Sequence, residues 1–282
     1  MSAQILDGKA VASAMLQELA SGVKKLDPKL VIVQIGDDPA SSTYIKHKIK
    51  SCDDIGMRHE HEHLKESTDL RQLLTLIHDL NDDPDVSGFI LQLPLPPALQ
   101  PSLPQIIREI DPRKDVDGFT AYNIGKMFLS PEFEHLPPAT PSGVITLLDH
   151  YKIPVEGKHA VVVGASNLVG KPLAVMLLNR AATVTVCHIK TVDLASHTRQ
   201  ADILCCAVGK ANLITADMVK PGAVVIDIGI SKDEEGLHGD VDFEAVKEIA
   251  SAITPVPGGV GPMTVASLIR NCVRAKERQT AS

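Results

Sequence analysis

The sequence predicts an α/β protein in which two domains each carry a parallel β-sheet, with a cleft between the domains. Apolar runs of strand length alternate with helical patterns along the chain. This alternation predicts parallel strands that are connected by crossover helices. A proline-rich stretch at 136–143 interrupts the alternation, which then restarts, so this stretch is a candidate hinge. A length of 282 residues fits two domains of modest size.

The composition is that of a globular protein with a substantial core. Hydrophobic residues make up 44% of the chain and charged residues 22%. A net charge of -7 and an aromatic content of 3% argue against a nucleic-acid partner. No apolar run is long enough to span a membrane, and the first residues lack the apolar core of a secretory signal. The five cysteines show no paired spacing, so we expect reduced thiols in a cytoplasmic protein.

The first half of the chain alternates between helix and strand. Asp38 can cap a helix whose first turn accepts Pro39, and Gly56 can end that helix. The expected elements are helix 8–26, strand 30–36, helix 39–55, strand 57–64, helix 69–81 and strand 86–96, which runs into a proline-rich loop.

The second half repeats this pattern. We expect a strand, tight turn and helix over 158–180, then buried strands at 182–188, 201–209 and 222–229. The segment from 253 onward reads as a strand, a glycine- and proline-rich loop, and a last helix that begins after Thr264. The expected domains are 1–139, completed by the C-terminal helix 263–282, and 140–262.

The turn "GASNLVGKP" indicates a dinucleotide site. It follows a strand and opens a helix, whose N-terminus attracts an anion. Gly164 permits a tight turn, the small Ser166 lets the backbone approach a pyrophosphate, and Gly170 lets the helix pack on the strand. The spacing is not the standard G-x-G-x-x-G, so a purely structural turn is the alternative.

The end of the next strand favours NADP over NAD. NAD-binding proteins usually carry an acidic residue there for the ribose 2′-hydroxyl, but "VCHIKT" holds none before Asp193. Lys190 or His188 could meet a 2′-phosphate.

Two further segments suggest ligand contacts. The loop "TPVPGGVGPMT" exposes bare backbone around Pro257, Gly258 and Gly259, which suits close contact with a flat ligand. In "DPRKDVDGF", Asp115 and Asp117 form either a turn, a metal pair or an acceptor for an amino-pyrimidine edge, and we favour the last use for one of them.

The stretch "SSTYIKHKIKS" holds a candidate acid/base pair. On a helix, Tyr44 and Lys48 lie one turn apart beside a buried stripe, whereas Lys46 and Lys50 lie on the other edge. Burial depresses a lysine pKa towards neutrality, as proton transfer requires, and Gln92 can hold the ammonium. An exposed pair without a catalytic role is the alternative.

Taken together, the chain resembles the bifunctional methylenetetrahydrofolate dehydrogenase/methenyltetrahydrofolate cyclohydrolase family along nearly its whole length. The matching segments are "YIKHK", "LQLPLP", "KDVDGF", "PATPSGV", "GASNLVGKP", "CHIKT", "AVGK", "GAVVIDIGI", "GDVDF" and "ITPVPGGVGPMT". The resemblance implies a Rossmann-like second domain, tetrahydrofolate substrates, a homodimer, and a place in one-carbon metabolism and purine biosynthesis.

The resemblance also implies roles for particular residues. Tyr44, Lys48, Gln92 and Asp117 would line the folate site as catalytic and substrate-binding residues. The dinucleotide site would contain Gly164, Ala165, Ser166, Ile189 and Ile230. Three positions depart from the common pattern, with Ala139, Ala165 and Ile189 standing where cysteine, arginine and serine are frequent. The last two weigh against NADP, so NAD stays open as the cofactor.

Three other classes were considered. Tyr-x-x-x-Lys also occurs in short-chain dehydrogenases, but there it follows the glycine-rich turn, and here it precedes it. His59, His61 and His63 share one strand face, yet a fourth ligand is missing and a solvated polar edge is the better interpretation, so no metal is expected. A non-catalytic nucleotide-binding protein would bind NADP without turnover.

Overall fold

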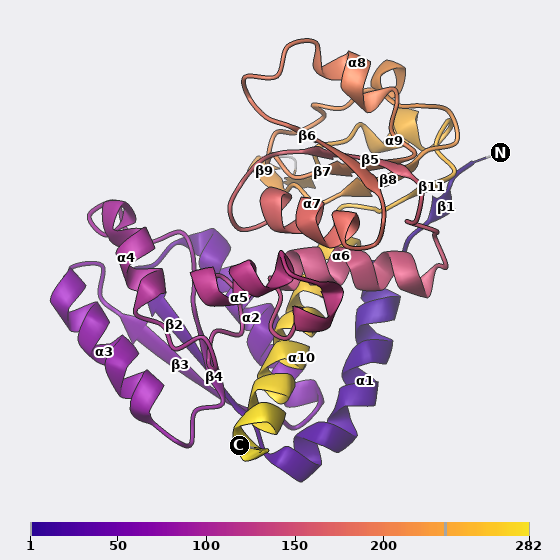
Figure 1. The fold of residues 1–282 in the computed structure, drawn as a ribbon. Coiled ribbons are helices and arrows are strands. Elements are labelled where there is room, and N and C mark those ends of the chain that lie inside the picture. Colours follow the sequence, from indigo (N-terminus) through magenta and orange to yellow (C-terminus); the bar gives the residue numbers. More distant parts are fainter. Residues whose placement is uncertain (1, 234–235, 282) are drawn as a thin grey trace. The chain divides into compact units, whose positions relative to one another are not determined.

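The computed structural model describes residues 2–233 and 236–281 (Figure 1). The chain divides into two compact units. The first, here called the three-stranded unit, contains Ala14–Ala139 and the residues from Val265 onward. The second, called the six-stranded unit, contains the residues up to Ser13 together with Thr140–Thr264. The two-domain α/β architecture predicted from the sequence is confirmed, with the first residues of the chain lying in the six-stranded unit.

The three-stranded unit is a parallel sheet with helices on both faces. Its strand order is β3-β2-β4. The elements are α1 (Gly8–Leu26, which begins in the other unit), β2 (Lys29–Ile35), α2 (Pro39–Asp54), β3 (Arg58–Leu64), α3 (Leu70–Asp82), β4 (Gly88–Leu91), η1 (Gln100–Ser102), α4 (Leu103–Arg108), α5 (Ala121–Met127), η2 (Pro131–Phe133) and most of α10 (Val260–Thr280).

The central strand β2 supplies both layers of core in this unit. Successive side chains of a strand point to opposite faces. Leu30 and Ile32 pack with residues of α1, α2 and α10, whereas Val31, Val33 and Ile35 pack with residues of α3 and α4. A continuous apolar run is therefore needed in β2, as is usual for a parallel strand buried on both faces.

Helix α2 begins and ends as its sequence predicts. The Asp38 carboxylate accepts a hydrogen bond from the Ser41 N–H at 2.7 Å, and Pro39 occupies the first turn. Gly56 follows the helix with a φ of 70°. The side chains of Ile45 and Cys52 are buried on the inner face, so the predicted rotation of this helix is confirmed.

The six-stranded unit has the order β1-β11-β8-β7-β5-β6, and all of these neighbours pair in parallel. The elements are β1 (Gln4–Ile5), α6 (Ala139–His150), β5 (His159–Val163), α7 (Gly170–Leu178), β6 (Thr183–Cys187), α8 (Leu194–Thr198), β7 (Ile203–Cys206), η3 (Ala216–Met218), β8 (Val224–Asp227), β9 (Ser231–Asp233), β10 (Gly236–His238), α9 (Phe243–Val246) and β11 (Ala252–Ile253). The residues before Ala14 belong here because β1 pairs with β11.

Two connecting segments are more helical than the sequence predicted. The candidate hinge at 136–143 contains the boundary between the two units, which falls between Ala139 and Thr140, but it is partly helical because α6 begins at Ala139. Pro141 is compatible with this, since the first turn of a helix needs no N–H donor. The last helix begins at Val260 rather than after Thr264, because Pro262 likewise falls in the first turn of α10.

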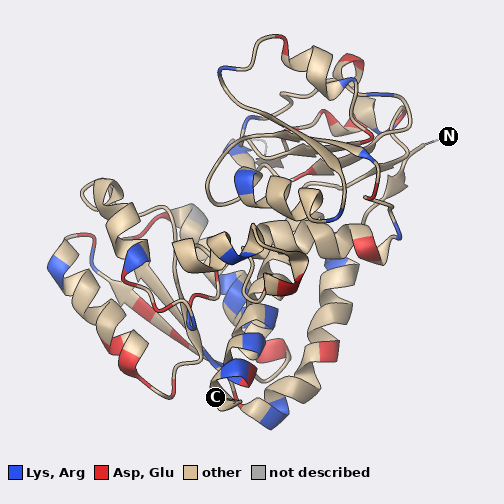
Figure 2. Cartoon of the chain, in the orientation of Figure 1, with Lys and Arg blue, Asp and Glu red and all other residues tan. Residues whose placement is uncertain are grey.

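Charge is distributed over both units. Basic and acidic residues are scattered over both units, and acidic residues mark β3 (Figure 2). Within the described part of the chain, no helix is both long and apolar enough to cross a membrane.

Candidate active site

A buried lysine on α2 is the centre of the site in the three-stranded unit. The side chains of Lys46 and Lys50 are exposed, whereas Lys48 is only 8% exposed. Burial lowers the pKa of the Lys48 ammonium, and the nearby Asp117 carboxylate partly opposes this shift. The predicted difference between Lys48 and the two outer lysines, Lys46 and Lys50, is therefore confirmed for their burial.

Gln92 holds this lysine. The Lys48 Nζ donates a hydrogen bond to the Gln92 side-chain oxygen at 2.9 Å. The Gln92 amide nitrogen in turn donates to the Leu93 carbonyl at 2.9 Å, which fixes which end of the amide faces the lysine. The Gln92 N–H bonds the Val33 carbonyl at 2.8 Å, so the residue continues the ladder from the end of β4. The predicted contact between Lys48 and Gln92 is thus present.

The strand order explains why Gln92 is well placed for binding. After β2 the chain forms β3 on one side of that strand and then β4 on its other side. The point between β2 and β4 is therefore the one at which the strand order reverses direction. Ligands of open parallel sheets bind outside the carboxyl ends of the strands at such a reversal. Gln92 directly follows the carboxyl end of β4.

The carboxylates of Asp115 and Asp117 have different environments. Asp115 is 2% exposed and accepts hydrogen bonds from the backbone N–H groups of Gly118, Phe119 and Thr120, and from the Asn123 side chain at 2.9 Å. It is fully committed to holding this turn. The sequence left open whether the pair forms a turn, and for Asp115 it does.

Asp117, by contrast, is available to a ligand. Its carboxylate has no hydrogen-bond partner among the described residues, and it lines a small apolar pocket beside Phe89, Leu91 and Phe119. Burial raises the pKa of Asp117 to about 6, opposed by the positive charge of Lys48. A carboxyl group poised near neutrality beside a buried amine is a feature of functional sites.

Tyr44 lies one helical turn before Lys48. Its side chain is partly buried, and this burial raises the pKa of its phenol. The phenol is thus a neutral group at neutral pH that can donate a hydrogen bond or pack against a ring.

The turn after β5 is built for close backbone approach. Gly164 has a φ of 116°, and a Cβ there would collide with the Ala207 carbonyl oxygen of the neighbouring strand end. A Cβ on Gly170 would collide with the Gly164 carbonyl oxygen. The Ser166 hydroxyl accepts the Val169 and Gly170 N–H groups at 3.1 and 3.3 Å, an additional role that the sequence did not reveal.

This turn also lies at a topological reversal. The chain leaves β5 for β6 on one side and reaches β7 on the other. The first N–H groups of α7 already have partners, because Gly170 donates to the Ser166 hydroxyl at 3.3 Å and Lys171 to the Ser166 carbonyl at 3.0 Å. What this end of the helix offers a dinucleotide phosphate is therefore the positive end of the helix dipole. Ala165, in the turn itself, and Ile230, in the segment after β8, are partly buried, and Ile189 is 97% exposed in the loop after β6. The residues of this unit therefore fit a dinucleotide.

The loop of residues 254–264 uses part of its bare backbone internally. A Cβ on Gly8 would collide with the Gly259 carbonyl oxygen, and the Lys9 N–H bonds the Gly258 carbonyl at 2.9 Å. Gly259 is buried, whereas Pro257 is exposed and Gly258 partly exposed. Of the three residues expected at the substrate, Pro257 and Gly258 are accessible in the six-stranded unit.

The histidines of β3 have partners already. His59 contacts the Asp53 carboxylate at 2.9 Å, His61 the Gln34 side-chain oxygen at 3.0 Å, and His63 the Gly36 carbonyl at 3.0 Å. Within residues 2–233 and 236–281, no group of three or more His, Cys, Asp or Glu side chains is arranged to hold a metal ion.

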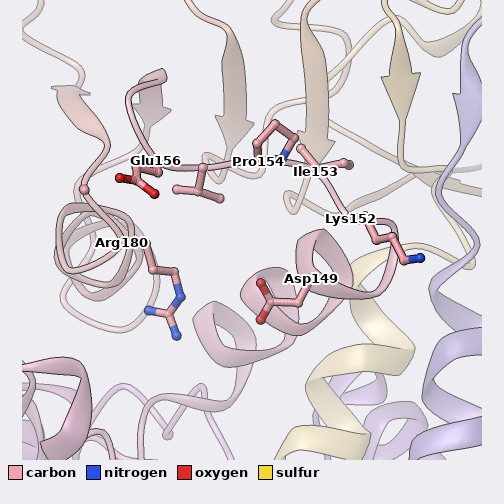
Figure 3. A pocket seen from close by; sticks show the side chains of 8 residues that line it. Asp149, Lys152, Ile153, Pro154, Glu156 and Arg180 are labelled. Carbon is pink, nitrogen blue, oxygen red and sulfur yellow. The ribbon is translucent and has the colours of Figure 1, made fainter.

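A larger hollow of about 720 Å³ lies elsewhere in the six-stranded unit (Figure 3). Asp149 and Arg180 point into it from the ends of α6 and α7. Its other lining residues are Lys152, Ile153, Pro154, Val155, Glu156 and Ala181. These residues precede β5 and β6, so the hollow lies at the amino end of the strands, the edge at which parallel sheets do not bind their ligands.

Two buried carboxylates near the dinucleotide turn escaped the sequence analysis. Asp227 is 4% exposed at the end of β8, and Asp240 is fully buried. The available signal was an acidic residue at the end of an apolar strand, in "VVIDIG", followed shortly by "GDVDF". Among the described residues, neither carboxylate forms an ion pair.

Comparison with known proteins agrees with this geometry. Residues 6–117 match the family model "Tetrahydrofolate dehydrogenase/cyclohydrolase, catalytic domain", and residues 138–280 match the "NAD(P)-binding domain" of the same family. The bifunctional protein FolD of Methanosarcina mazei is 49% identical over 281 residues, covering 98% of this chain and 96% of the relative.

Two solved structures share the fold. The bifunctional FolD methylenetetrahydrofolate dehydrogenase/cyclohydrolase of Campylobacter jejuni has a TM-score of 0.93 at 45% identity, covering 98% of this chain and 99% of its own. The Trypanosoma brucei dehydrogenase-cyclohydrolase, complexed with NADP cofactor and inhibitor, has a TM-score of 0.96 at 33% identity over 100% of both chains. With both halves of its length matched, the chain belongs to the tetrahydrofolate dehydrogenase/cyclohydrolase family.

Proposed function

We propose that this chain carries out two consecutive reactions on a tetrahydrofolate. It oxidises 5,10-methylenetetrahydrofolate to 5,10-methenyltetrahydrofolate with NADP+, and it hydrolyses the methenyl product to 10-formyltetrahydrofolate. Family membership supports both activities. The observation that carries the chemical assignment is the buried contact between the Lys48 ammonium and the Gln92 side chain at 2.9 Å.

Lys48 is the proposed proton-transfer group of the hydrolysis. When water adds to the methenyl carbon, one proton must leave the water and another must reach the ring nitrogen as the ring opens. An ordinary lysine is too basic to exchange protons efficiently at neutral pH, but burial lowers the pKa of Lys48. The Gln92 side-chain oxygen accepts a hydrogen bond from the Lys48 ammonium. This bond restricts the directions in which the other N–H bonds of the ammonium point.

Asp117 and Tyr44 are proposed to hold the substrate. The Asp117 carboxylate lines the pocket and accepts no hydrogen bond from the part of the chain that the structure describes, so it suits the amino edge of a pterin, which presents parallel N–H donors. The partly buried Tyr44 ring would pack on the folate and restrict Lys48 on its side. Pro257, Gly258 and Gly259 are proposed as further substrate contacts, with Gly259 acting through the shape of its loop.

The six-stranded unit is proposed to bind the dinucleotide through Gly164, Ala165, Ser166, Ile189 and Ile230. The bound cofactor supplies the hydride acceptor. The Gly164–Gly170 turn and the N-terminus of α7 would hold the pyrophosphate, because they combine bare backbone with the positive end of a helix dipole. NADP+ is favoured because no carboxylate stands at the end of β6, although Ala165 and Ile189 offer the 2′-phosphate no hydrogen bond from their side chains.

The wider setting is also proposed. We infer a folate-binding domain of residues 1–139, completed by 263–282, and a dinucleotide-binding domain of 140–262. A cytoplasmic location is supported by five cysteines that are all buried free thiols. A homodimer and a contribution to purine biosynthesis follow from the family resemblance, and neither a nucleic acid nor a membrane is among the proposed partners.

The decisive experiment is a single spectrophotometric assay. Purified protein is mixed with methylenetetrahydrofolate and either NADP+ or NAD+, and the absorbance of the reduced cofactor and of methenyltetrahydrofolate is followed. The proposal requires reduced NADP to form, with methenyltetrahydrofolate consumed in turn. Cofactor binding without turnover would instead identify a nucleotide-binding protein.

A further inference from the structure

Asp240 is a buried carboxylate whose hydrogen bonds converge on one loop. It is 0% exposed, and it accepts the Val208 N–H at 2.6 Å and the Lys210 N–H at 2.7 Å. Both donors belong to the turn that follows β7, here called the β7 turn (Ala207–Lys210). A buried charge without an opposite charge is costly, and these short bonds to N–H groups are what offset that cost.

A second carboxylate, that of Asp227, binds the backbone of Asp240. Asp227 accepts the Asp240 N–H at 2.9 Å and the Val241 N–H at 3.0 Å. A Cβ on Gly239 would collide with the Asp227 carboxylate, and one on Gly229 would collide with that of Asp240. The backbone therefore passes close to both acids, and only glycine fits at these two positions.

The β7 turn is in contact with two segments of the proposed dinucleotide site. On one side, the Ala207 carbonyl oxygen lies so close to Gly164 that a side chain there would collide with it. On the other, a Cβ on Gly209 would lie 3.8 Å from the Ile230 carbonyl oxygen, an ordinary van der Waals distance. This turn therefore lies against the backbone of Gly164 and close to that of Ile230, so a change in its conformation would be felt at both residues.

We propose that Asp240 is a positioning residue for the dinucleotide, acting through the β7 turn rather than by touching the cofactor. This inference rests on the proposed dinucleotide site. It predicts a selective defect, because the turn bears on Gly164 and Ile230 in the six-stranded unit, whereas Lys48 and Gln92 belong to the three-stranded unit. The hydrolysis of methenyltetrahydrofolate consumes no dinucleotide, so it serves as an internal control.

The test compares Asp240→Asn with the wild-type protein. An asparagine has one acceptor oxygen and would turn an NH2 group towards one of the two N–H donors, so the turn loses a bond to a charged acceptor. We expect the KM for NADP+ to rise about tenfold or more, the scale of one charged hydrogen bond. The kcat at saturating NADP+ and the cyclohydrolase rate should each stay within about threefold of wild type.

Asp242→Asn is the matched control. Asp242 lies two positions along the same segment, but its carboxylate caps α9 by accepting the Ala245 N–H at 3.2 Å. This variant should leave the KM for NADP+ unchanged. A folded Asp240→Asn protein with an unchanged KM, or one in which both activities fall in parallel, would overturn the proposal.

A second variant approaches the turn from its other side. Gly209 has a φ of 77°, so Gly209→Ala strains the β7 turn without altering either acid. It should raise the KM for NADP+ and spare the cyclohydrolase, and if it does not, the proposal fails even where Asp240→Asn does not fold. A wild-type protein that hydrolyses methenyltetrahydrofolate but reduces no dinucleotide would refute the proposed function instead.

Discussion

The Lys48 ammonium donates to the Gln92 side-chain oxygen at 2.9 Å, and this contact joins the middle of α2 to the carboxyl end of β4. A single hydrogen bond thus places a buried amine at the reversal point of the three-stranded sheet. Because the lysine is buried and its pKa is lowered, it can exchange protons where an exposed lysine stays charged.

Removing the amine should separate the two activities. In Lys48→Met the apolar stem is kept and the titrating group is lost, so we expect cyclohydrolase activity to fall by about two to four orders of magnitude. Dehydrogenase activity should fall much less, and methenyltetrahydrofolate should accumulate in the coupled assay. Lys46→Met, on the exposed side of α2, is the control and should cost little. An equal loss of both activities in a folded Lys48→Met protein would restrict Lys48 to substrate binding.

The raised pKa of Asp117 should appear in the pH dependence of stability. Its folded value of about 6 lies above the ordinary 3.8, so between these values the native state holds a proton that the unfolded state has lost. Stability from this group is therefore present below about pH 4 and is lost as the pH rises to about 6. Asp117→Asn removes the loss, so the variant should gain about 1–3 kcal/mol relative to wild type over this range.

Urea unfolding at pH 4, 5, 6 and 7 measures this gain. Asp54→Asn is the control because Asp54 lies at the end of α2 and its exposed carboxylate pairs with Lys50 in solvent. Parallel stability curves for wild type and Asp117→Asn would show that Asp117 titrates normally.

Cofactor choice should depend on charge in the loop after β6. Lys190 is exposed there, and its N–H donates to the His188 Nδ1 at 3.1 Å, which keeps the loop turned. Lys190→Glu should weaken NADP+ more than NAD+, since it repels only the 2′-phosphate. Lys152→Glu makes the same change in net charge at the opposite edge of the sheet and should affect neither. A native preference for NAD+, or equal effects of Lys190→Glu on both cofactors, would contradict this prediction.

The histidines of β3 should be dispensable for catalysis. Each ring nitrogen nearest the protein already contacts a protein oxygen, and the stacked rings of His61 and His63 lie 5.5 Å apart. His61→Ala should change either activity by less than about twofold, and chelators should leave both unchanged. Stoichiometric zinc in the purified protein, or inactivation by a chelator, would revive a metal site.

The sequence predicted best what depends on local periodicity. The burial of Lys48 and the exposure of Lys46 follow from helical spacing alone, and the cap at Asp38 follows from its position before Pro39. The pairing of Lys48 with Gln92 joins residues 44 positions apart, so local periodicity does not predict it, and the family resemblance was what placed both residues at one site.

What the sequence did not reveal depends on contacts between distant segments. Asp240 resembles any acidic loop residue until the β7 turn is seen to donate two N–H groups to it. Gly258 and Gly259 suggested contact with a ligand, yet the backbone of Gly259 packs closely against Gly8 instead. A sequence pattern cannot show such a contact between distant segments. Proline misled the assignment at 136–143 and at 254–264, because prolines in the first turn of a helix and prolines in a loop look alike in sequence.

The exposure of the loop after β6 has an evolutionary consequence. Ile189 and Val192 are 97% and 84% exposed, so they contribute little to the core that holds the sheet together. Substitutions at such positions usually change stability by less than about 0.5 kcal/mol. Substitutions in this loop can therefore change the preference between NADP and NAD without lowering the stability of the fold. Related proteins can differ in their cofactor while the rest of the structure stays the same.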